Sequence, residues 1–263
     1  MSADKFFQKI ALLRCPVCGA AFSQCGASLR CKSGHTFDPS GKGYVHFAPN
    51  AGPSRYDAAL FEARRRILTA GFYDTVKEAI RKAFPKDANV VFDAGCGDGS
   101  FTKALQGKTT VGLDLSKDAI RLAARGGGPV LWMVGDLTRI PLQNDSVDVI
   151  LNLFSPAHYA EFSRVLKKDG LLLKLVPQSG YLREIRALAG LGVYSNDAVV
   201  SHLAEQFRLR DRIRLTRTFP LTEAQARDFL VMTPLTFGVA VESLDASRLT
   251  EITIDVELLI AKV

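Results

Sequence analysis

The chain has 263 residues, of which 47% are hydrophobic and 23% are charged, and its formal net charge is +7. This ordinary globular composition excludes collagen-like, low-complexity and wholly disordered proteins. No apolar run approaches the ~20 residues of a membrane-spanning helix, and the first residues lack the basic and then apolar layout of a signal peptide. We therefore expect a cytoplasmic protein with no membrane partner.

The excess positive charge lies entirely in the first third of the chain. Residues 1–86 carry 14 basic and 6 acidic side chains, a balance of +8, whereas residues 87–263 carry 20 and 21, a balance of −1. A basic appendage beside a near-neutral body is typical of a protein that binds a polyanion. A basic surface without a ligand explains the charge equally well, so both interpretations stay open.

Three stretches follow one another along the chain. Residues 1–48 are rich in Gly and Cys, and residues 49–86 open with a linker at 49–53 and continue into two predicted helices. From residue 87 onward strands and helices alternate, which predicts an α/β domain with a parallel, doubly wound sheet. The predicted helices are Tyr56–Thr69, Tyr73–Phe84, Gly99–Leu105, Lys117–Ala124 and Ala157–Leu166, and the predicted strands are Val90–Asp93, Thr109–Leu113, Leu131–Val134, Val147–Phe154, Gly170–Val176 and Glu251–Val263.

Four potential metal ligands lie close together near the N-terminus. Cys15, Cys18, Cys31 and His35 form the pattern C-x2-C-x12-C-x3-H. Two turns that each present a ligand pair are typical of a tetrahedral Zn²⁺ site, and a site filled by four protein ligands is structural. Such binding contributes on the order of 10–16 kcal/mol to the folding of a small domain. The sequence thus predicts a structural zinc ion.

The neighbouring cysteines and histidines give weaker signals. A redox C-x-x-C motif with unrelated thiols nearby is the alternative to zinc, although the spacing of the second ligand pair favours the metal. Cys25 has no partner two or three residues away, which favours a free thiol. His46 lies in a strand-like segment, and we interpret it as an ordinary strand residue.

Glycines follow the first apolar strand of the α/β region. Gly95, Gly97 and Gly99 stand between this strand and the next helix, where the backbone must approach a ligand closely. Ser100 occupies the position of the third glycine in the dinucleotide fingerprint, so that fingerprint fits poorly. Cys96 lies inside the loop, and its small size in a tight turn is an adequate structural reason for its presence.

Acidic residues mark the ends of neighbouring strands. Asp93 precedes the glycines, Asp114 ends the second strand and Asp136 follows the third. Asp114 is placed to accept hydrogen bonds from both ribose hydroxyls of a nucleoside, and Asp136 can meet an adenine amino group. With the glycine loop they look like the S-adenosylmethionine site of a seven-strand, Rossmann-like class I methyltransferase. An NAD-type domain or a degenerate domain without a ligand is the alternative.

The order of these motifs resembles one family, the 23S ribosomal RNA (guanine-N1)-methyltransferases, which include macrolide-resistance enzymes. The resemblance spans nearly the whole chain, and a metal knuckle ahead of this core is specific. It divides the chain into a zinc-binding RNA-recognition domain (1–48), a linker with helices (49–86) and a methyltransferase domain (87–263). The residues that carry it are Leu13–Cys18, Cys31, His35, Phe37–Asp38, Gly43–Val45, Glu62–Arg64, Gly71–Tyr73, Asp93–Gly99, Gly112–Lys117 and Met232–Pro234.

The resemblance implies an activity and particular residue roles. The family methylates N1 of a guanine in a 23S rRNA hairpin, and its two branches modify neighbouring guanines. The segments Asn152–Pro156 and Val176–Pro177 favour the branch that includes tylosin resistance, whereas Gly52–Leu60 departs from the family's pattern. The zinc ligands of the family match the four residues named above. Its cofactor contacts match Tyr73, Gly97, Asp98 and Tyr181.

Methyl transfer to guanine N1 makes three demands on the protein. The acceptor must be aligned with the methyl group, its Watson–Crick edge must be unpaired or flipped out, and the N1 proton must be removed. In the loop after the fourth strand, Asn152 is predicted to hydrogen-bond the guanine and Phe154 to stack on it, with a purely structural loop as the alternative. No acidic or histidine base is evident from the sequence.

Basic residues predict where the RNA binds. The run Arg64, Arg65 and Arg66 is predicted to contact phosphates together with the zinc domain. A second set alternates along one strand face, where RNA contact and a charged edge strand are equally good explanations. This set contains Arg208, Arg210, Arg212 and Arg214.

Two other functions stay open on the sequence alone. One is a methyltransferase of a small metabolite in which zinc only holds the N-terminus, and the basic first third opposes it. The other is a zinc-dependent RNA-binding protein without catalysis, which the intact glycine loop and Asp114 oppose. The sequence leaves open which guanine is modified, whether naked or assembled RNA is the substrate, and whether the enzyme forms a homodimer.

Overall fold

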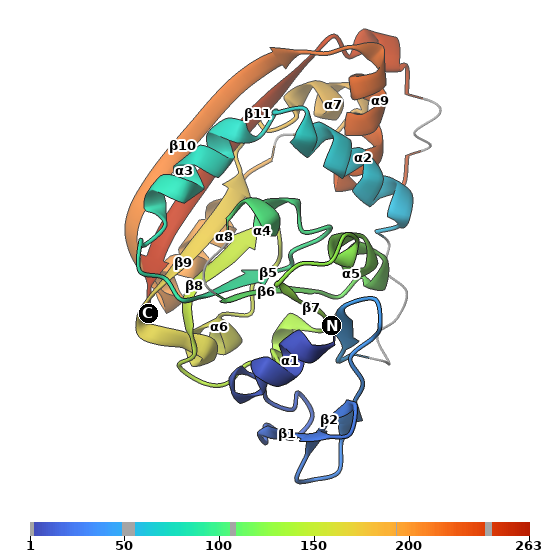
Figure 1. The fold of residues 1–263 in the computed structure, drawn as a ribbon. Coiled ribbons are helices and arrows are strands. Elements are labelled where there is room, and N and C mark those ends of the chain that lie inside the picture. The colour runs from blue at the N-terminus through green and yellow to red at the C-terminus, as the bar shows by residue number, and fades with distance from the viewer. Residues whose placement is uncertain (1–2, 49–55, 106–108, 193, 240–243) are drawn as a thin grey trace.

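The computed structural model describes residues 3–48, 56–105, 109–192, 194–239 and 244–263 (Figure 1). They form one large sheet covered by helices, with a small ribbon at the N-terminal end of the chain. No described helix is long and apolar enough to cross a membrane. The predicted linker at 49–53 lies outside the described residues, as does the start of the divergent segment 52–60.

The large sheet has eight strands in the order β10-β11-β9-β8-β5-β6-β7-β4. Among the described strands of this sheet, β11 runs in the direction opposite to the other seven. This is the expected seven-strand class I methyltransferase sheet with β4 added at one edge. The strands are β4 (Tyr44–His46), β5 (Val90–Ala94), β6 (Thr109–Asp114), β7 (Leu131–Val134), β8 (Val147–Leu153), β9 (Leu166–Pro177), β10 (Arg208–Pro220) and β11 (Glu251–Lys262).

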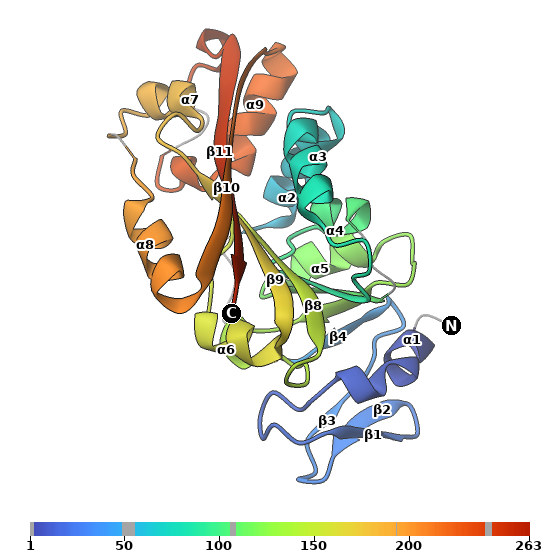
Figure 2. The same ribbon diagram turned by 90° about the vertical axis from the view of Figure 1, so that its left-hand side faces the viewer.

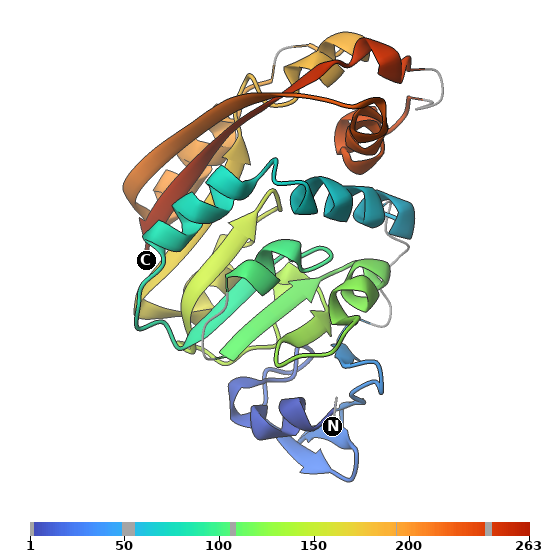
Figure 3. The same ribbon diagram turned by 45° about the horizontal axis from the view of Figure 1, so that its top comes forward.

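Helices cover both faces of the sheet (Figure 2). One face carries α3, α4 and α5, whereas α6 and α8 lie on the other face. Beyond the top of the sheet α2 packs against α9, the helix that connects β10 to β11 (Figure 3). The helices are α2 (Ala58–Thr69), α3 (Asp74–Ala83), α4 (Ser100–Ala104), α5 (Lys117–Ala124), α6 (Tyr159–Val165), α7 (Arg183–Leu188), α8 (Asp197–Gln206) and α9 (Glu223–Met232).

Local chemistry explains where several helices begin. Asp57 accepts a hydrogen bond from the backbone N–H of Leu60 at the start of α2, and Ser116 caps α5 in the same way. Thr222 and Gln225 form a capping box at the start of α9, which satisfies two otherwise unpaired N–H groups. All the predicted helices and strands named above are present, and α5 and β7 match their predicted bounds.

The N-terminal ribbon shares its core with the large sheet. It contains α1 (Asp4–Gln8) and the antiparallel strands β1 (Phe22–Cys25), β2 (Ser28–Cys31) and β3 (Thr36–Phe37). One apolar cluster runs from Phe6, Leu29 and Phe47 into Met133 and Leu142. β4 leaves the ribbon and pairs in parallel with β7. One hydrophobic core therefore extends across the predicted domain boundary at residue 48. A functional boundary at this position stays a prediction.

Candidate active site and metal centre

The four predicted zinc ligands converge on one point of the ribbon, where their ligand atoms lie within 4.8 Å of one another. Sγ of Cys18 is 3.6 Å from Sγ of Cys31. Nδ1 of His35 is 3.6 Å from Sγ of Cys15 and 3.4 Å from Sγ of Cys31. A tetrahedral ion with bonds of ~2.3 Å to sulfur and ~2.0 Å to nitrogen needs ligand separations of this size. The donor set therefore fits a structural zinc ion.

Two glycines shape the turns that present these ligands. The φ angles of Gly19 and Gly34 are 72° and 85°, in the left-handed region that glycine adopts without steric cost. The N–H of Gly19 donates to the carbonyl of Cys15, and that of Gly34 donates to the carbonyl of Cys31. The backbone therefore turns tightly beside each ligand pair. Cys25 is exposed and lies outside the cluster.

The loop between β5 and α4 depends on glycine for two different reasons. Gly95, Gly97 and Gly99 all have positive φ angles, of 81°, 55° and 74°. A Cβ on Gly95 would lie 1.9 Å from Oγ of Ser155, and one on Gly99 would lie 2.4 Å from Cη2 of Trp132. A Cβ on Gly97 would find its nearest neighbour at 3.4 Å. Gly95 and Gly99 thus permit close packing, whereas Gly97 leaves a cradle beside the cleft that a ligand can enter.

Asp114 connects this loop to the end of β6. Its Oδ2 accepts a hydrogen bond from the N–H of Gly97 at 2.9 Å, and its Oδ1 accepts one from the N–H of Ser116 at 2.8 Å. Burial raises the pKa of the Asp114 carboxyl above its usual value. The carboxylate therefore fixes the two loops that a nucleoside must meet at this edge of the sheet.

The other predicted carboxylates also follow strands. Asp93 is buried at the end of β5, where Thr102 donates a hydrogen bond to its Oδ2 at 2.6 Å, and burial raises the pKa of Asp93 to about 7. Asp98 accepts a hydrogen bond from the hydroxyl of Ser100 at 2.6 Å. Asp136 accepts one from the N–H of Thr138 at 2.8 Å and so caps the turn after β7.

Three aromatic side chains meet beside the glycine loop. The hydroxyls of Tyr73 and Tyr181 are 2.7 Å apart. The ring of Phe154 stacks on Tyr181 with 5.4 Å between centroids, and its edge contacts Tyr73 at 5.9 Å. Phe154 has a φ angle of 55°, a strained conformation for a residue with a side chain. Strain of this kind concentrates at functional sites.

A single cleft of about 1090 Å³ unites most of these residues. Ligand pockets in proteins usually measure ~300–1,000 Å³, so the cleft has room for more than one small ligand. Gly99, Asn152, Arg65 and Arg66 do not line it. The predicted residues that do line it are Tyr73, Asp93, Gly95, Gly97, Asp98, Asp114, Asp136, Tyr181, Phe154 and Arg64.

Sequence reasoning missed several residues that line the cleft, among them Lys174, Arg186, Tyr194 and His202. The guanidinium of Arg186 lies 4.9 Å from the ring centroid of Tyr194. These two residues carry no local signal, because only the fold brings them together. Lys174 did carry one, since it interrupts the apolar run of β9. None of the four residues belongs to a motif with recognisable spacing.

Asn152 is fully buried beneath the loop that follows β8. Its Nδ2 donates to the carbonyls of Ala94 at 3.1 Å and Pro156 at 2.9 Å. Its Oδ1 accepts a hydrogen bond from Nζ of Lys174 at 2.5 Å. These bonds use both amide protons, so Asn152 fixes the loop in this structure. Its predicted contact with guanine stays a prediction.

The predicted RNA-binding arginines of α2 also have intramolecular partners. Arg64 donates to the carbonyl of Met232 at 3.3 Å. Arg66 makes a two-pronged ion pair with Asp228, with distances of 2.8 and 2.5 Å. Both contacts tie α2 to α9, while the Arg66 side chain remains 60% exposed. Phosphate contact by this run stays a prediction.

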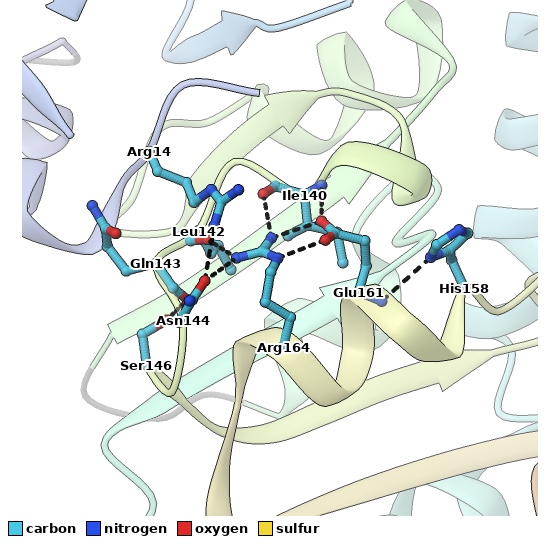
Figure 4. Close-up of polar contacts among 9 residues, drawn as sticks. All are labelled: Arg14, Ile140, Leu142, Gln143, Asn144, Ser146, His158, Glu161 and Arg164. Atoms are coloured by element: carbon cyan, nitrogen blue, oxygen red, sulfur yellow. Dashed lines mark hydrogen bonds and ion pairs between the residues drawn. The ribbon is translucent and has the colours of Figure 1, made fainter. Parts of the chain in front are cut away.

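A polar network joins the ribbon to the methyltransferase body (Figure 4). Arg14 and Arg164 both donate to Oδ1 of Asn144, at 2.8 and 3.0 Å. Arg164 also forms an ion pair with Glu161 and donates to the carbonyls of Ile140 and Leu142. Because Arg14 precedes the zinc ligand Cys15, the metal centre is held directly against the body.

The sheet order, the glycine loop and the carboxylates at the ends of β5, β6 and β7 define a class I S-adenosylmethionine-dependent methyltransferase. The cleft and the cradle at Gly97 fit that cofactor. Burial raises the pKa of Cys96 well above its usual value, which agrees with a structural role for this thiol. The ribbon adds a zinc centre to this class of enzyme.

Comparisons with known proteins identify the family. The family described as "Methyltransferase domain" matches residues 92–173, and the family described as "RlmA, N-terminal" matches residues 13–51. A Bacillus subtilis (strain 168) protein, provisionally named 23S rRNA (guanine-N(1)-)-methyltransferase YxjB, is 38% identical over 95% of this chain and 96% of its own. The 23S rRNA (guanine(748)-N(1))-methyltransferase of Streptomyces fradiae is 31% identical over 78% of this chain and 81% of its own.

Solved structures share the fold at much lower identity. A chain in the complex between the Haloferax volcanii Trm112 methyltransferase activator and a methyltransferase aligns with a TM-score of 0.54 and 18% identity, covering 79% of this chain and 95% of that chain. YcgJ of Bacillus subtilis aligns with a TM-score of 0.52 and 16% identity, covering 72% of this chain and 98% of that chain. These two likenesses support the fold alone.

The chain belongs to the 23S rRNA (guanine-N1)-methyltransferase family. It is an S-adenosylmethionine-dependent rRNA methyltransferase with a structural zinc site. The NAD-type and redox interpretations left open by the sequence are thereby set aside.

Proposed function

We propose that the protein methylates N1 of one guanine in a hairpin of 23S rRNA, and that this modification contributes to macrolide resistance. The Streptomyces fradiae relative, whose name specifies guanine 748, supports a single-guanine target. Because ribosomal RNA is the substrate, we place the enzyme in the cytoplasm.

The observation that carries the proposal is the continuity of the cleft. Its carboxylate-lined half, with Asp114 and Asp136, continues without interruption into the aromatic half with Phe154 and Tyr181. Aromatic faces stack on unpaired bases, and such stacking is worth ~1–3 kcal/mol per base. The cleft can therefore hold a nucleoside cofactor and a flipped base side by side.

This chain's residues would position both partners. When bound, S-adenosylmethionine supplies an electrophilic methyl group on a sulfonium sulfur, so the protein needs only to align and deprotonate the acceptor. Asp114 and Asp136 would meet the ribose and adenine, and Phe154 would stack on the guanine. Asn152 would keep the loop that carries Phe154 in place. Arg64–Arg66 and the zinc ribbon would contact RNA phosphates.

Primer extension on 23S rRNA tests the proposal. N1 methylation blocks the Watson–Crick edge, so reverse transcriptase should stop one nucleotide before the modified guanine in cells with the gene and read through in cells without it. A new stop in a hairpin, together with a raised inhibitory concentration of tylosin, would support the proposal. Identical patterns of stops in the two strains would refute the substrate while leaving the class of enzyme intact.

The small-metabolite alternative predicts a different result. Such an enzyme would consume S-adenosylmethionine in a ribosome-free extract as fast as in a complete one. The rRNA enzyme would need the ribosomal fraction. Measuring methyl incorporation from labelled cofactor in both extracts separates the two.

A further inference from the structure

The buried amine of Lys174 lines the cleft. The one contact of this amine described so far is its hydrogen bond to Asn152. Lys174 is 3% exposed and lies near the C-terminal end of β9 between Leu173 and Leu175. Its register partners are Asn152 on β8 and Leu259 on β11. Within the described ranges no carboxylate forms an ion pair with it, which is unusual because buried lysines are almost always paired.

The amine of Lys174 donates two hydrogen bonds. Nζ lies 2.5 Å from Oδ1 of Asn152 and 3.3 Å from the carbonyl oxygen of Ser155. The orientation of the Asn152 amide is fixed, because its Nδ2 faces the carbonyls of Ala94 and Pro156. Both partners of Lys174 therefore only accept. A neutral amine has two protons to donate and one lone pair, so these two acceptors leave the lone pair free.

Burial brings the deprotonation of Lys174 close to physiological pH, so that a fraction of the amine is neutral there. It lowers the pKa of Lys174 to about 8, and a bound sulfonium cation in the same cleft would lower that pKa further. On the neighbouring strand β11, Asp255 and Glu257 are already paired with Arg214 and Arg212. The other titratable or charged side chains that line the cleft are Asp93, Asp98, Asp114, Asp136, Cys96, Tyr73, Tyr181, Tyr56, Tyr159, Tyr194, His158, His202, Arg64 and Arg186.

We propose that the neutral amine of Lys174 is the general base that accepts the N1 proton of the target guanine. This rests on the proposed function. As the N1–H bond breaks and its proton passes to Nζ, the N1 electron pair forms the bond to the methyl carbon. The carbon–sulfur bond breaks and sulfur keeps that electron pair. The products are N1-methylguanine, S-adenosylhomocysteine and the Lys174 ammonium, which returns its proton to solvent.

Single-turnover methylation of 23S rRNA from a strain that lacks the gene tests this role. The readout is methyl incorporation from labelled S-adenosylmethionine at saturating RNA between pH 6 and 10. The wild-type rate should rise with pH and level off near or below pH 8. Lys174→Met should be slower by at least ~100-fold, the usual contribution of a general base, and its rate should keep rising with hydroxide concentration.

Two further variants separate a base from a side chain that only positions the loop. Lys174→Gln keeps an N–H donor for Asn152 but has no basic lone pair, so it should be as slow as Lys174→Met. Lys174→Ala should be rescued by small primary amines, and more strongly by more basic ones. Lys174→Gln with the wild-type rate, or a slow Lys174→Met that keeps the wild-type pH inflection, would overturn the proposal.

Lys5 offers a matched control. It is a partly buried amine, with Nζ 2.7 Å from the carbonyl of Val130 and 3.3 Å from that of Gly128, and burial lowers its pKa to about 8. It does not line the cleft. Lys5→Met should keep the wild-type pH inflection of the single-turnover rate. Wild-type enzyme that leaves guanine N1 unmodified would refute the proposed function itself, whatever the variants do.

Discussion

At the scale of single residues, burial without a counter-charge sets the chemistry of the cleft. Asp93 and Lys174 are both nearly inaccessible to water, and the burial shifts their pKa values towards 7 and 8 from opposite directions. Removing a charge from water favours the neutral form of an acid and of an amine alike. Such shifts have consequences for stability as well as for catalysis.

Asp93→Asn should change how stability depends on pH. The pKa of Asp93 is raised in the folded protein from 3.8 to about 7, so the unfolded chain loses its proton first as the pH rises. Wild-type stability should therefore fall between pH 4 and 7 by up to about 4 kcal/mol through this group. Chemical denaturation of the cofactor-free protein should show that the free energy of unfolding of Asp93→Asn rises relative to that of wild type over this interval. Above it the difference should stay constant.

A gain for Asp93→Asn that is already complete at pH 4, or one that grows above pH 8, would contradict the shift. Asp136→Asn is a suitable control, because Asp136 is an exposed cap at the end of β7.

Gly95→Ala should weaken cofactor binding by misplacing the loop after β8. The new Cβ would lie 1.9 Å from Oγ of Ser155, and a left-handed residue with a side chain costs roughly 1–2 kcal/mol. We expect the dissociation constant of S-adenosylmethionine, measured by calorimetry, to rise at least ~10-fold, which corresponds to 1.4 kcal/mol.

The double variant Gly95→Ala/Ser155→Gly removes the clash but keeps the backbone strain. It should recover part of the lost affinity. Equal losses in the single and double variants would show that Ser155 is not the obstacle.

At the scale of elements, two arginines of the edge strand β10 form ion pairs with carboxylates of the neighbouring strand β11. Arg212 pairs with Glu257 and Arg214 with Asp255, each through two hydrogen bonds. Asp255 and Glu257 are buried, whereas both arginines are about half exposed. Of the two explanations that the alternating arginines allowed, the described contacts favour the charged edge strand.

Arg214→Met should therefore lower stability and leave RNA affinity unchanged. It removes the counter-charge of the buried Asp255, which keeps its hydrogen bonds from Thr216 and from the N–H of Gly180. A hydrogen bond to a charged group contributes about 1.5–3 kcal/mol. Thermal unfolding and filter binding of 23S rRNA are the two measurements. Arg217→Met is the control, since Arg217 lies on the same strand and makes no ion pair within the described residues. A stable Arg214→Met with weaker, less salt-dependent RNA binding would instead place RNA on this face.

Local signals in the sequence predicted elements wherever caps and periodicity agreed. α5 begins at its Ser116 cap and ends where predicted, and the all-apolar β7 has its predicted bounds. The zinc ligands were predictable because all four lie in one short segment, where their spacing is typical of a zinc site. The cleft residues Arg186 on α7 and His202 on α8 could not be predicted, because these two helices reach the cleft only after β9 and β11 have paired. The partnership of Lys174 with Asn152 likewise depends on the register of two strands.

At the scale of the whole molecule, the zinc ribbon and the methyltransferase body are packed as one continuous unit, and we expect them to unfold together. They share an apolar cluster, a polar network around Arg164 and the pairing of β4 with β7. Structural zinc contributes on the order of 10–16 kcal/mol to small sites. Loss of the metal should therefore lower the stability of the shared core and not of the ribbon alone.

Cys31→Ser should abolish zinc binding and lower the unfolding temperature of the whole protein. The single tryptophan, Trp132, lies buried in β7 beside β4 and reports on the body. Its fluorescence transition should move down together with the loss of zinc measured in the purified protein. Cys25→Ser, which changes the exposed thiol outside the cluster, should keep both zinc and midpoint. An unmoved Trp132 transition in Cys31→Ser would show two independent units.

The attachment of β4 to β7 also dictates an order of events during synthesis. The metal ligands leave the ribosomal exit tunnel well before β7, and Tyr44–His46 must wait for Leu131–Val134 to emerge before their backbone finds a partner. Contacts between such distant segments form slowly. The nascent ribbon therefore spends that interval with the apolar side that it later buries against the body uncovered, and we expect early capture of zinc to keep it ordered until β7 has been made.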